Sequence, residues 1–484
     1  MALKKIITST LIYTIIGALP LASAFFLLPF YTNYLTINDF GALMLYISFS
    51  GFVQIIINYG LDTYIGMSYF DTKHDTALFR NHIGTIVGYL LISGIITITI
   101  ITSFGNKIFD VVFGNNGMAF YPYGLMSVLT AFFNSFFKTY SNLLVNQQRA
   151  MMFLWTNLAN FVMTIAFSLS GILIYPYTLI GPMWGRLLSG VGIFLIALFF
   201  FYRESNVQIT FGKTLKTAFS FSIPVLVYFL LSWLISNGDR YIINFYMTKE
   251  DIAIFDFAVK CTLLIDFALR GLGSMIMPKV YEMMTDQKLT STSQEFNRYF
   301  SSYTAVSLLF IPWVTLLVPL LLPIIIFKPE YNHSFLFLSL LCIGFVFTGL
   351  TGYFQAPIYF FKKTKLLTKV YLISALFQML ITVFLIKYYG LWGAVAASVI
   401  AKIIQNIFLY FEARKIFTFK FNVTKLVILP MAVVLFMAST DFFLTLKNMH
   451  FIHLLQLIFT TILVVLIYWK ELIIFFRKFI LKPN

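Results

Sequence analysis

Seven charged side chains interrupt the long apolar stretches of this chain, and their types suggest phosphate binding. Five are cations and two are carboxylates: Lys138, Arg186, Lys260, Arg270 and Lys402, with Asp256 and Asp266. An ionisable group in an apolar stretch is costly to bury and is by default a functional candidate. Guanidinium and ammonium groups form charge-assisted hydrogen bonds with phosphate oxygens, so the excess of cations predicts an anionic, phosphate-bearing ligand.

Four of these charges lie close together in the sequence. At about 100° per residue, Asp256, Lys260, Asp266 and Arg270 fall within a sector of about 120°, so a helix there has one charged wall. The same spacing allows a second interpretation, in which each aspartate pairs with the cation four residues later and Lys138 extends to the membrane interface. The sequence leaves both interpretations open.

The other polar motifs match no catalytic apparatus. Asp239 and Arg240 lie at the predicted outer end of an apolar run, where an ion pair with a structural or gating role is expected. A mixed group of charges between residues 62 and 82, including Asp62, is expected to form a solvated hinge. No His/Cys/Asp/Glu spacing indicates a metal site, and no glycine-rich phosphate loop indicates nucleotide hydrolysis. We therefore predict no metal, no cofactor and no enzyme activity.

The elements that carry the charges are apolar runs of membrane-spanning length. The chain of 484 residues is 60% hydrophobic and 11% charged, which leaves too few polar groups to cover a soluble protein. Runs of about 20 apolar residues, enough to cross a bilayer as a helix, recur about fourteen times. We predict an all-α polytopic membrane protein with helices over 10–32, 40–59, 82–104, 119–144, 152–173, 178–201, 216–238, 252–276, 301–326, 334–360, 367–387, 391–411, 425–444 and 452–469.

The distribution of Lys and Arg predicts the orientation. Loops on the side of the N-terminus hold 23 of the 34 basic residues, the opposite loops hold 6, and the remaining 5 lie within predicted helices. Because basic loops stay in the cytoplasm, both termini are predicted to be cytoplasmic. The net charge of +16 is spread over these loops rather than along one groove, so membrane lipids are expected partners and nucleic acid is not.

Two parts of the chain resemble each other. Gly181-Pro182-Met183-Trp184-Gly185 recurs as Gly390-Leu391-Trp392-Gly393, and both elements begin a predicted helix. An even number of helices per copy gives both copies the same orientation, as in transporters built from parallel repeats. We predict two pseudo-symmetric six-helix lobes, 1–205 and 206–418, around a central cavity, followed by two additional helices and a basic tail over 419–484.

Several short motifs point to one superfamily. They are Gly60-Leu61-Asp62-Thr63, Ile223-Pro224, Ser236-Asn237-Gly238-Asp239-Arg240-Tyr241 and Gly390-Leu391-Trp392-Gly393-Ala394. Together with the layout of nearly the whole chain, they resemble the polysaccharide repeat-unit flippases, of the O-antigen type, in the multidrug/oligosaccharidyl-lipid/polysaccharide exporter superfamily. The resemblance implies a bacterial inner-membrane protein that exports an undecaprenyl-pyrophosphate-linked oligosaccharide, with other polysaccharide-assembly membrane proteins as partners.

The charges and the resemblance combine into one hypothesis. The lipid-linked oligosaccharide enters from the inner leaflet, its phosphates contact the five cations, and the lobes then open outward by alternating access. Asp256 and Asp266 are the candidates for coupling to a proton or sodium gradient. Two alternatives stay open: a lipid or drug exporter of the same superfamily, and a membrane-embedded glycosyl transferase or polymerase, which the short outer loops disfavour.

Overall fold

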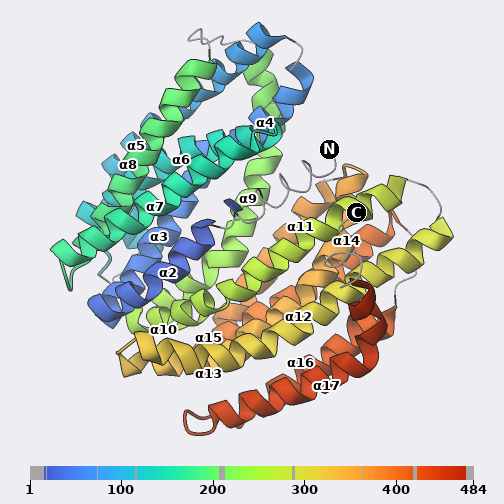
Figure 1. Ribbon diagram of the computed structural model, residues 1–484. Helices are drawn as coiled ribbons and strands as arrows, with labels where there is room; N and C mark the ends of the chain where they lie inside the picture. The colour runs from blue at the N-terminus through green and yellow to red at the C-terminus, as the bar shows by residue number, and fades with distance from the viewer. Residues whose placement is uncertain are drawn as a thin grey trace. The chain divides into compact units, whose positions relative to one another are not determined.

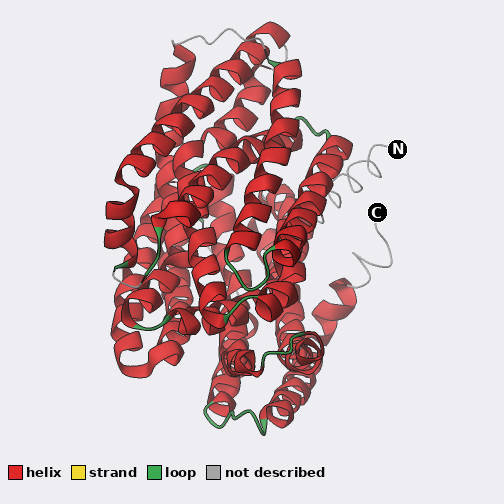
Figure 2. Ribbon diagram, turned by 90° about the vertical axis from the view of Figure 1, so that its left-hand side faces the viewer, coloured by secondary structure: helices red, strands yellow, loops and turns green. Residues whose placement is uncertain are grey.

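The computed structural model describes residues 13, 16, 17, 19–72, 75–114, 117–205, 213–285, 289–363, 365–417 and 422–475. All regular structure in these ranges is helical, and Figure 2 shows the helices joined by short loops. The predicted all-α class is therefore confirmed.

Ten helical segments in the described ranges are long and apolar enough to cross a bilayer. They are α3 (Ile37–Asn58), α5 (Thr76–Phe113), α7 (Ala150–Ile174), α8 (Ile180–Glu204), Thr217–Tyr246, Glu295–Ile325, Pro329–Phe360, α15 (Lys365–Arg414), Thr424–Asp441 and Met449–Ile473. Each overlaps a predicted span, and α15 covers two of them. The remaining predicted spans coincide with α2 (Leu19–Tyr34), α6 (Leu125–Asn146) and the consecutive helices α10 (Lys249–Cys261) and α11 (Leu263–Thr285). The chain is a multi-pass membrane protein.

The contacts between helices divide the chain into a first unit, Met1–Ala253, and a second unit, Ile254–Asn484. In the first unit, α6 packs against α3, α8 and the short helix α4 (Leu61–Thr72), while α7 packs against α2 and α8 (Figure 1). The helix α9 (Lys213–Tyr246) packs on α3, α4 and α5. Large side chains such as Tyr46, Phe136 and Tyr140 are fully buried in this unit.

The second unit is built around α12 (Leu289–Ile325), which packs against α11 and α17 (Met449–Phe475). The stretch after α12 contains η2 (Pro329–Ser334), α13 (Phe335–Ile343), η3 (Gly344–Phe347) and α14 (Thr348–Phe360). Helix α13 contacts both α15 and α16 (Leu429–Asp441), which follows the short helix η4 (Thr424–Ile428). The additional helices α16 and α17 therefore share the core of the second unit.

The predicted lobe boundaries rest on a sequence repeat, whereas the two units rest on contacts. By its contacts α9 belongs to the first unit, although the repeat begins the second lobe at residue 206. A repeat and a contact unit are different properties, so the lobe boundaries stay a prediction.

The repeated glycine motif has the same local role in both places. In α15, Gly390 has φ 56° and ψ −135°, which breaks the helix between the two predicted spans, and a Cβ on Gly393 would collide with the Leu385 carbonyl oxygen. A Cβ on Gly185 would likewise collide with the backbone of Phe167 in the preceding helix α7. In both motifs the glycine allows two successive helices to approach at backbone distance.

Candidate functional site

A break between α3 and α4 positions the first buried charge. Tyr59 and Gly60 both have left-handed backbone conformations, with φ 52° and φ 77°, so helix α3 ends at Asn58 and α4 begins at Leu61. Gly60 lies against the Ser222 carbonyl oxygen and Val225 of α9, where a side chain would be crowded. This turn places Asp62 in the first turn of α4, facing α6.

Asp62 is the centre of a polar contact that we call the Asp62 cluster: Asp62, Lys138, Asn142 and Phe229. Lys138 Nζ lies 3.3 Å from Asp62 Oδ2, and Asn142 Nδ2 donates to the same oxygen at 3.1 Å. Lys138 and Asn142 are one turn apart on α6, so both reach the same side of α4. The Phe229 ring of α9 lies 5.0 Å from the Lys138 ammonium.

The two charges of the Asp62 cluster differ in exposure. The Asp62 side chain is 1% exposed and its Oδ1 has no hydrogen-bond partner in the described ranges, whereas the Lys138 side chain is 37% exposed. The expectation that Asp62 belongs to a solvated hinge is wrong, because the break at Tyr59 and Gly60 turns this carboxylate into the helix bundle. Lys138 is thus held by a buried anion while part of its ammonium side chain stays accessible to an incoming ligand.

Arg186 lies in the second turn of α8 and is half-buried. In the part of the chain that the structure describes, no carboxylate lies within ion-pair distance of its guanidinium. A guanidinium cannot lose its charge in a protein, so this cation has to be satisfied by water or by an anionic ligand.

The first unit places Lys138 and Arg186 at different depths. A Cβ on Gly190 of α8 would lie 3.7 Å from Asn134 Oδ1 of α6, so these two positions are level with each other. Because α7 reverses the chain between them, α6 and α8 run in the same direction. Arg186 precedes Gly190 by one turn and Lys138 follows Asn134 by one turn, so about 12 Å separates the cations along the bundle.

In the second unit, both predicted i,i+4 ion pairs form. Lys260 Nζ lies 3.7 Å from Asp256 Oδ2, and Arg270 Nε donates to Asp266 Oδ2 at 2.8 Å. The carboxylate of Asp256 is fully buried, while the Arg270 side chain is 67% exposed. The charged wall therefore consists of two neutralised pairs on α10 and α11, separated by the break at Thr262.

Lys402 lies on α15, close to a 3-10 turn in the preceding span. The segment Gly344–Phe347 forms the 3-10 helix η3, and a Cβ on Gly344 would lie 3.0 Å from Lys402 Nζ. The ammonium also lies 4.5 Å from the centre of the Phe345 ring, a cation–π contact. Gly344 therefore leaves the space into which the Lys402 ammonium fits.

Asp239 and Arg240 do not end their helix at a surface. Helix α9 continues to Tyr246, and both side chains are 5% exposed. Arg240 donates to the Ser236 carbonyl oxygen at 2.9 Å, and the adjacent Tyr241 ring stacks on Phe113 of α5. The motif is thus part of the packing between α9 and α5, and its gating role stays a prediction.

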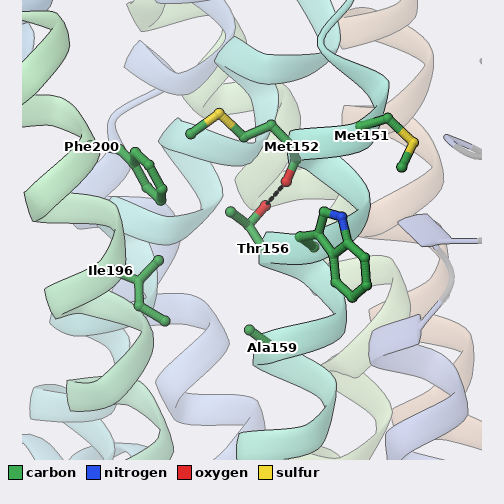
Figure 3. Close-up of a pocket in the computed structure, with 7 residues that line it drawn as sticks. Met151, Met152, Thr156, Ala159, Ile196 and Phe200 are labelled. Carbon is green, nitrogen blue, oxygen red and sulfur yellow. Dashed lines mark hydrogen bonds between the residues drawn. The ribbon is translucent and has the colours of Figure 1, made fainter.

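An apolar hollow of about 450 Å³ lies on α7 and α8 (Figure 3). Met151, Met152, Trp155 and Ala159 line it from α7, and Ile196 and Phe200 from α8. The Thr156 hydroxyl donates to the Met152 carbonyl oxygen at 2.8 Å, so it offers no free donor to a ligand. The hollow can hold hydrocarbon but has no group for a phosphate or a sugar.

Sequence reasoning brings out the cations but misses buried acids, among them Asp62 and Asp441. Asp62 is assigned to a hinge because a left-handed turn after Asn58 cannot be read from hydropathy. Asp441 is not counted among the membrane charges although it lies within the predicted span 425–444. The feature they share is that each lies three residues from the end of a predicted span, Asp62 after residue 59 and Asp441 before residue 444.

A family model gives the family of this chain, and solved structures give its fold. Residues 3–284 match the family described as "Polysaccharide biosynthesis protein". A search of curated protein sequences finds no match. Several solved structures share the fold, at 14% identity or less for the three given next.

The lipid II flippase MurJ in an inward closed conformation matches with a TM-score of 0.74 and 14% identity, over 96% of this chain and 100% of that chain. An inward-facing multidrug resistance MATE family transporter of the MOP superfamily matches with a TM-score of 0.68 and 14% identity, over 83% and 94% of the two chains. The Vibrio cholerae MATE transporter VcmN in the bent form matches with a TM-score of 0.56 and 12% identity, over 85% and 96%.

Proposed function

Because the chain belongs to the polysaccharide biosynthesis protein family and shares the fold of MurJ and MATE transporters, we propose that it is a flippase for a lipid-linked oligosaccharide. The proposed cargo is an undecaprenyl-pyrophosphate-linked repeat unit of the O-antigen type, moved from the inner to the outer leaflet by alternating access. The proposed location is the bacterial inner membrane, with both termini in the cytoplasm.

The observation that carries this proposal is the guanidinium of Arg186 in a membrane helix, which has no carboxylate within ion-pair distance among the described residues. A pyrophosphate supplies several oxygens that match the planar fork of a guanidinium. Lys138 lies about 12 Å nearer the predicted cytoplasmic end, so it is the first cation that a headgroup arriving from the inner leaflet meets. Transfer of the headgroup from Lys138 to Arg186 would move it away from the predicted cytoplasmic side of the membrane.

The other predicted site residues keep their proposed roles with one restriction. Lys138, Lys260 and Arg270 each lie beside a carboxylate, so they can bind phosphate only by sharing or exchanging that partner. Lys402 contributes a charge beside η3. Coupling to a proton or sodium gradient through Asp256 or Asp266 stays a prediction, as does a chamber that joins the cations of both units.

A drug exporter of the same fold is the alternative. A site for organic cations needs an excess of acidic groups, whereas the five membrane cations outnumber the three carboxylates that pair with them, Asp62, Asp256 and Asp266. They still exceed the acids by one when the buried Asp441 is counted. This charge balance favours an anionic cargo.

The test is flipping of a fluorescent undecaprenyl-pyrophosphate oligosaccharide in proteoliposomes, read by quenching from the outside. Charge-assisted hydrogen bonds are worth about 1.5–3 kcal/mol, so Arg186→Ala should slow flipping by about tenfold to a hundredfold. Arg186→Lys should retain an intermediate rate because it keeps the charge but loses the fork. The matched control is Arg203→Ala in the last turn of the same helix, where Arg203 stacks on Phe199. Equal rates for Arg186→Ala and the wild type would refute the proposal.

A further inference from the structure

A second buried polar cluster lies in the second unit, where α13, α16 and α17 meet. Asp441 is the last residue of α16 and is 4% exposed. Gln456 of α17 donates to Asp441 Oδ1 at 2.8 Å and to Thr440 Oγ1 at 2.8 Å, which uses both hydrogens of its amide. Ser339 of α13 lies against the same carboxyl group and reaches Gln456 Oε1 at 3.5 Å. None of these residues belongs to the cation sites described above.

The carboxyl group of Asp441 has no counter-ion in the described part of the chain. Its Oδ2 has no hydrogen-bond partner, and no Lys, Arg or His lies within ion-pair distance. Cys342 of α13 interacts electrostatically with both Asp441 and Lys402 of α15. The other titratable groups on the elements packed against α16 are Glu295, Arg298, Tyr299 and Tyr303 of α12, Lys425 of η4, Lys447 of the loop between α16 and α17, and His450, His453, Tyr468, Lys470 and Glu471 of α17. Of these, His453 is fully buried, and both of its ring nitrogens lack a partner as well.

A buried carboxylate with one amide donor and no cation is poorly stabilised in a membrane helix, because neither lipid nor the apolar core supplies the missing solvation. We propose that Asp441 is a proton-binding site, occupied at neutral pH and in exchange with water at the predicted outer surface. A protonated carboxyl keeps the acceptor that Gln456 uses. The Ser339 hydroxyl, which both donates and accepts, is the available acceptor for the new O–H.

The atoms around the Asp441 carboxyl group favour binding of a proton over binding of a sodium ion. A hard cation needs several oxygen ligands, whereas Gln456 turns its amide nitrogen, not its carbonyl oxygen, towards Asp441. Thr440 Oγ1 already accepts from Gln456 and donates to the Met437 carbonyl oxygen. This leaves Asp441 Oδ2 as the one carboxyl oxygen of the cluster without a partner among the described residues.

The position of Asp441 provides a short route to water. Asp441 is the last residue of α16, and the loop that follows carries exposed polar side chains at Thr445 and Lys447. The buried carboxyl group is therefore four to six residues from the polar part of this loop. Coupling of this proton to cargo movement rests on the proposed function, whereas proton binding itself does not.

Infrared spectroscopy of the full chain in lipid nanodiscs tests proton binding directly. We expect a protonated-carboxyl C=O band at neutral pH that shifts in heavy water and disappears in Asp441→Asn. Asp256→Asn is the matched control, because Asp256 is equally buried but has Lys260 at 3.7 Å, and it should leave the band unchanged. A wild-type protein without the band, or a band that survives Asp441→Asn, would overturn the proposal.

Two further measurements keep the test decisive if Asp441→Asn does not fold. Gln456→Leu removes the donor to Oδ1, so the band should persist and move to higher wavenumber; an unchanged position would refute the assignment. Replacing sodium by choline should leave the band unchanged, and a band that grows on sodium removal would show that sodium, not a proton, occupies the site.

Transport then reports on coupling. With an imposed pH gradient, flipping by the wild type should accelerate at least threefold, and Asp441→Asn should lose this response while keeping its rate without a gradient. A wild type that moves no lipid-linked oligosaccharide would refute the proposed function but leave the infrared result standing. An Asp441→Asn protein that still responds to the gradient would refute coupling through this residue.

Discussion

Replacing Lys138 by Met should destabilise the first unit, because it removes the cation beside a buried carboxylate. Asp62 is 1% exposed and has Lys138 at 3.3 Å, with Asn142 as its other partner. Loss of one partner of a buried ion pair costs about 3–5 kcal/mol. The Lys138 side chain is 37% exposed and partly screened by solvent, so we expect about 2–3 kcal/mol instead.

The assay is denaturation by sodium dodecyl sulfate from mild detergent micelles, followed by circular dichroism. A double-mutant cycle with Asp62→Asn isolates the pair: in the Asp62→Asn background, Lys138→Met should cost about 1 kcal/mol or less, because no charge is left unpaired. The matched control is Lys369→Met. Lys369 lies 3.0 Å from Glu412, but its side chain is 58% exposed and Lys415 also pairs with Glu412 at 2.7 Å.

We expect Lys369→Met to cost less than about 1 kcal/mol, as for other exposed ion pairs. Equal costs for Lys138→Met and Lys369→Met, or additivity of the two changes in the cycle, would show that the burial of Asp62 does not determine the energy of its pair.

Two more predictions concern packing and pH. Gly393→Ala should destabilise the second unit by about 1–3 kcal/mol in the same denaturation assay, because the new Cβ would collide with the Leu385 carbonyl oxygen. The control is Gly273→Ala in α11, where no atom lies within contact distance of the new Cβ, so this change should be neutral or stabilising. Burial lowers the pKa of Lys249, which donates to the Gly117 carbonyl oxygen at 3.1 Å, below its ordinary value of 10.5. Because the unfolded chain then binds the extra proton, stability should rise as the pH climbs from the lowered pKa to 10.5, and Lys249→Met should lack this rise in alkaline denaturation series.

The sequence predicts the helices well because lipid imposes one simple rule, that about 20 apolar residues form a span. The same rule says nothing of where a helix breaks. The turn at Tyr59 and Gly60 depends on left-handed backbone conformations and on contacts with α9, which are tertiary properties. For this reason α4 and the buried position of Asp62 are not foreseen, whereas the turn at Gly390 is, because a tryptophan and a second glycine repeat an earlier motif.

Candidate charges are also easier to find than to assign. Spacing alone predicts that Asp256 can pair with Lys260 and Asp266 with Arg270, and both pairs form. Spacing cannot show which charge lacks a partner, because that depends on every neighbouring helix. Arg186 and Asp441 stand out only when the surrounding elements are known.

Four of the buried carboxylates, Asp62, Asp256, Glu412 and Asp441, can therefore be distinguished by whether a cation neutralises them rather than by how deeply they are buried. Asp62, Asp256 and Glu412 each have a lysine within 3.7 Å, so their ionised form is compensated and a proton would have to displace an ion-pair partner. Asp441 is just as buried and has one glutamine amide and one serine hydroxyl in place of a cation. A proton that enters this bundle gains most where no lysine competes with it. Among these four carboxylates, the acid at the end of α16 is thus the one whose charge can change without breaking an ion pair.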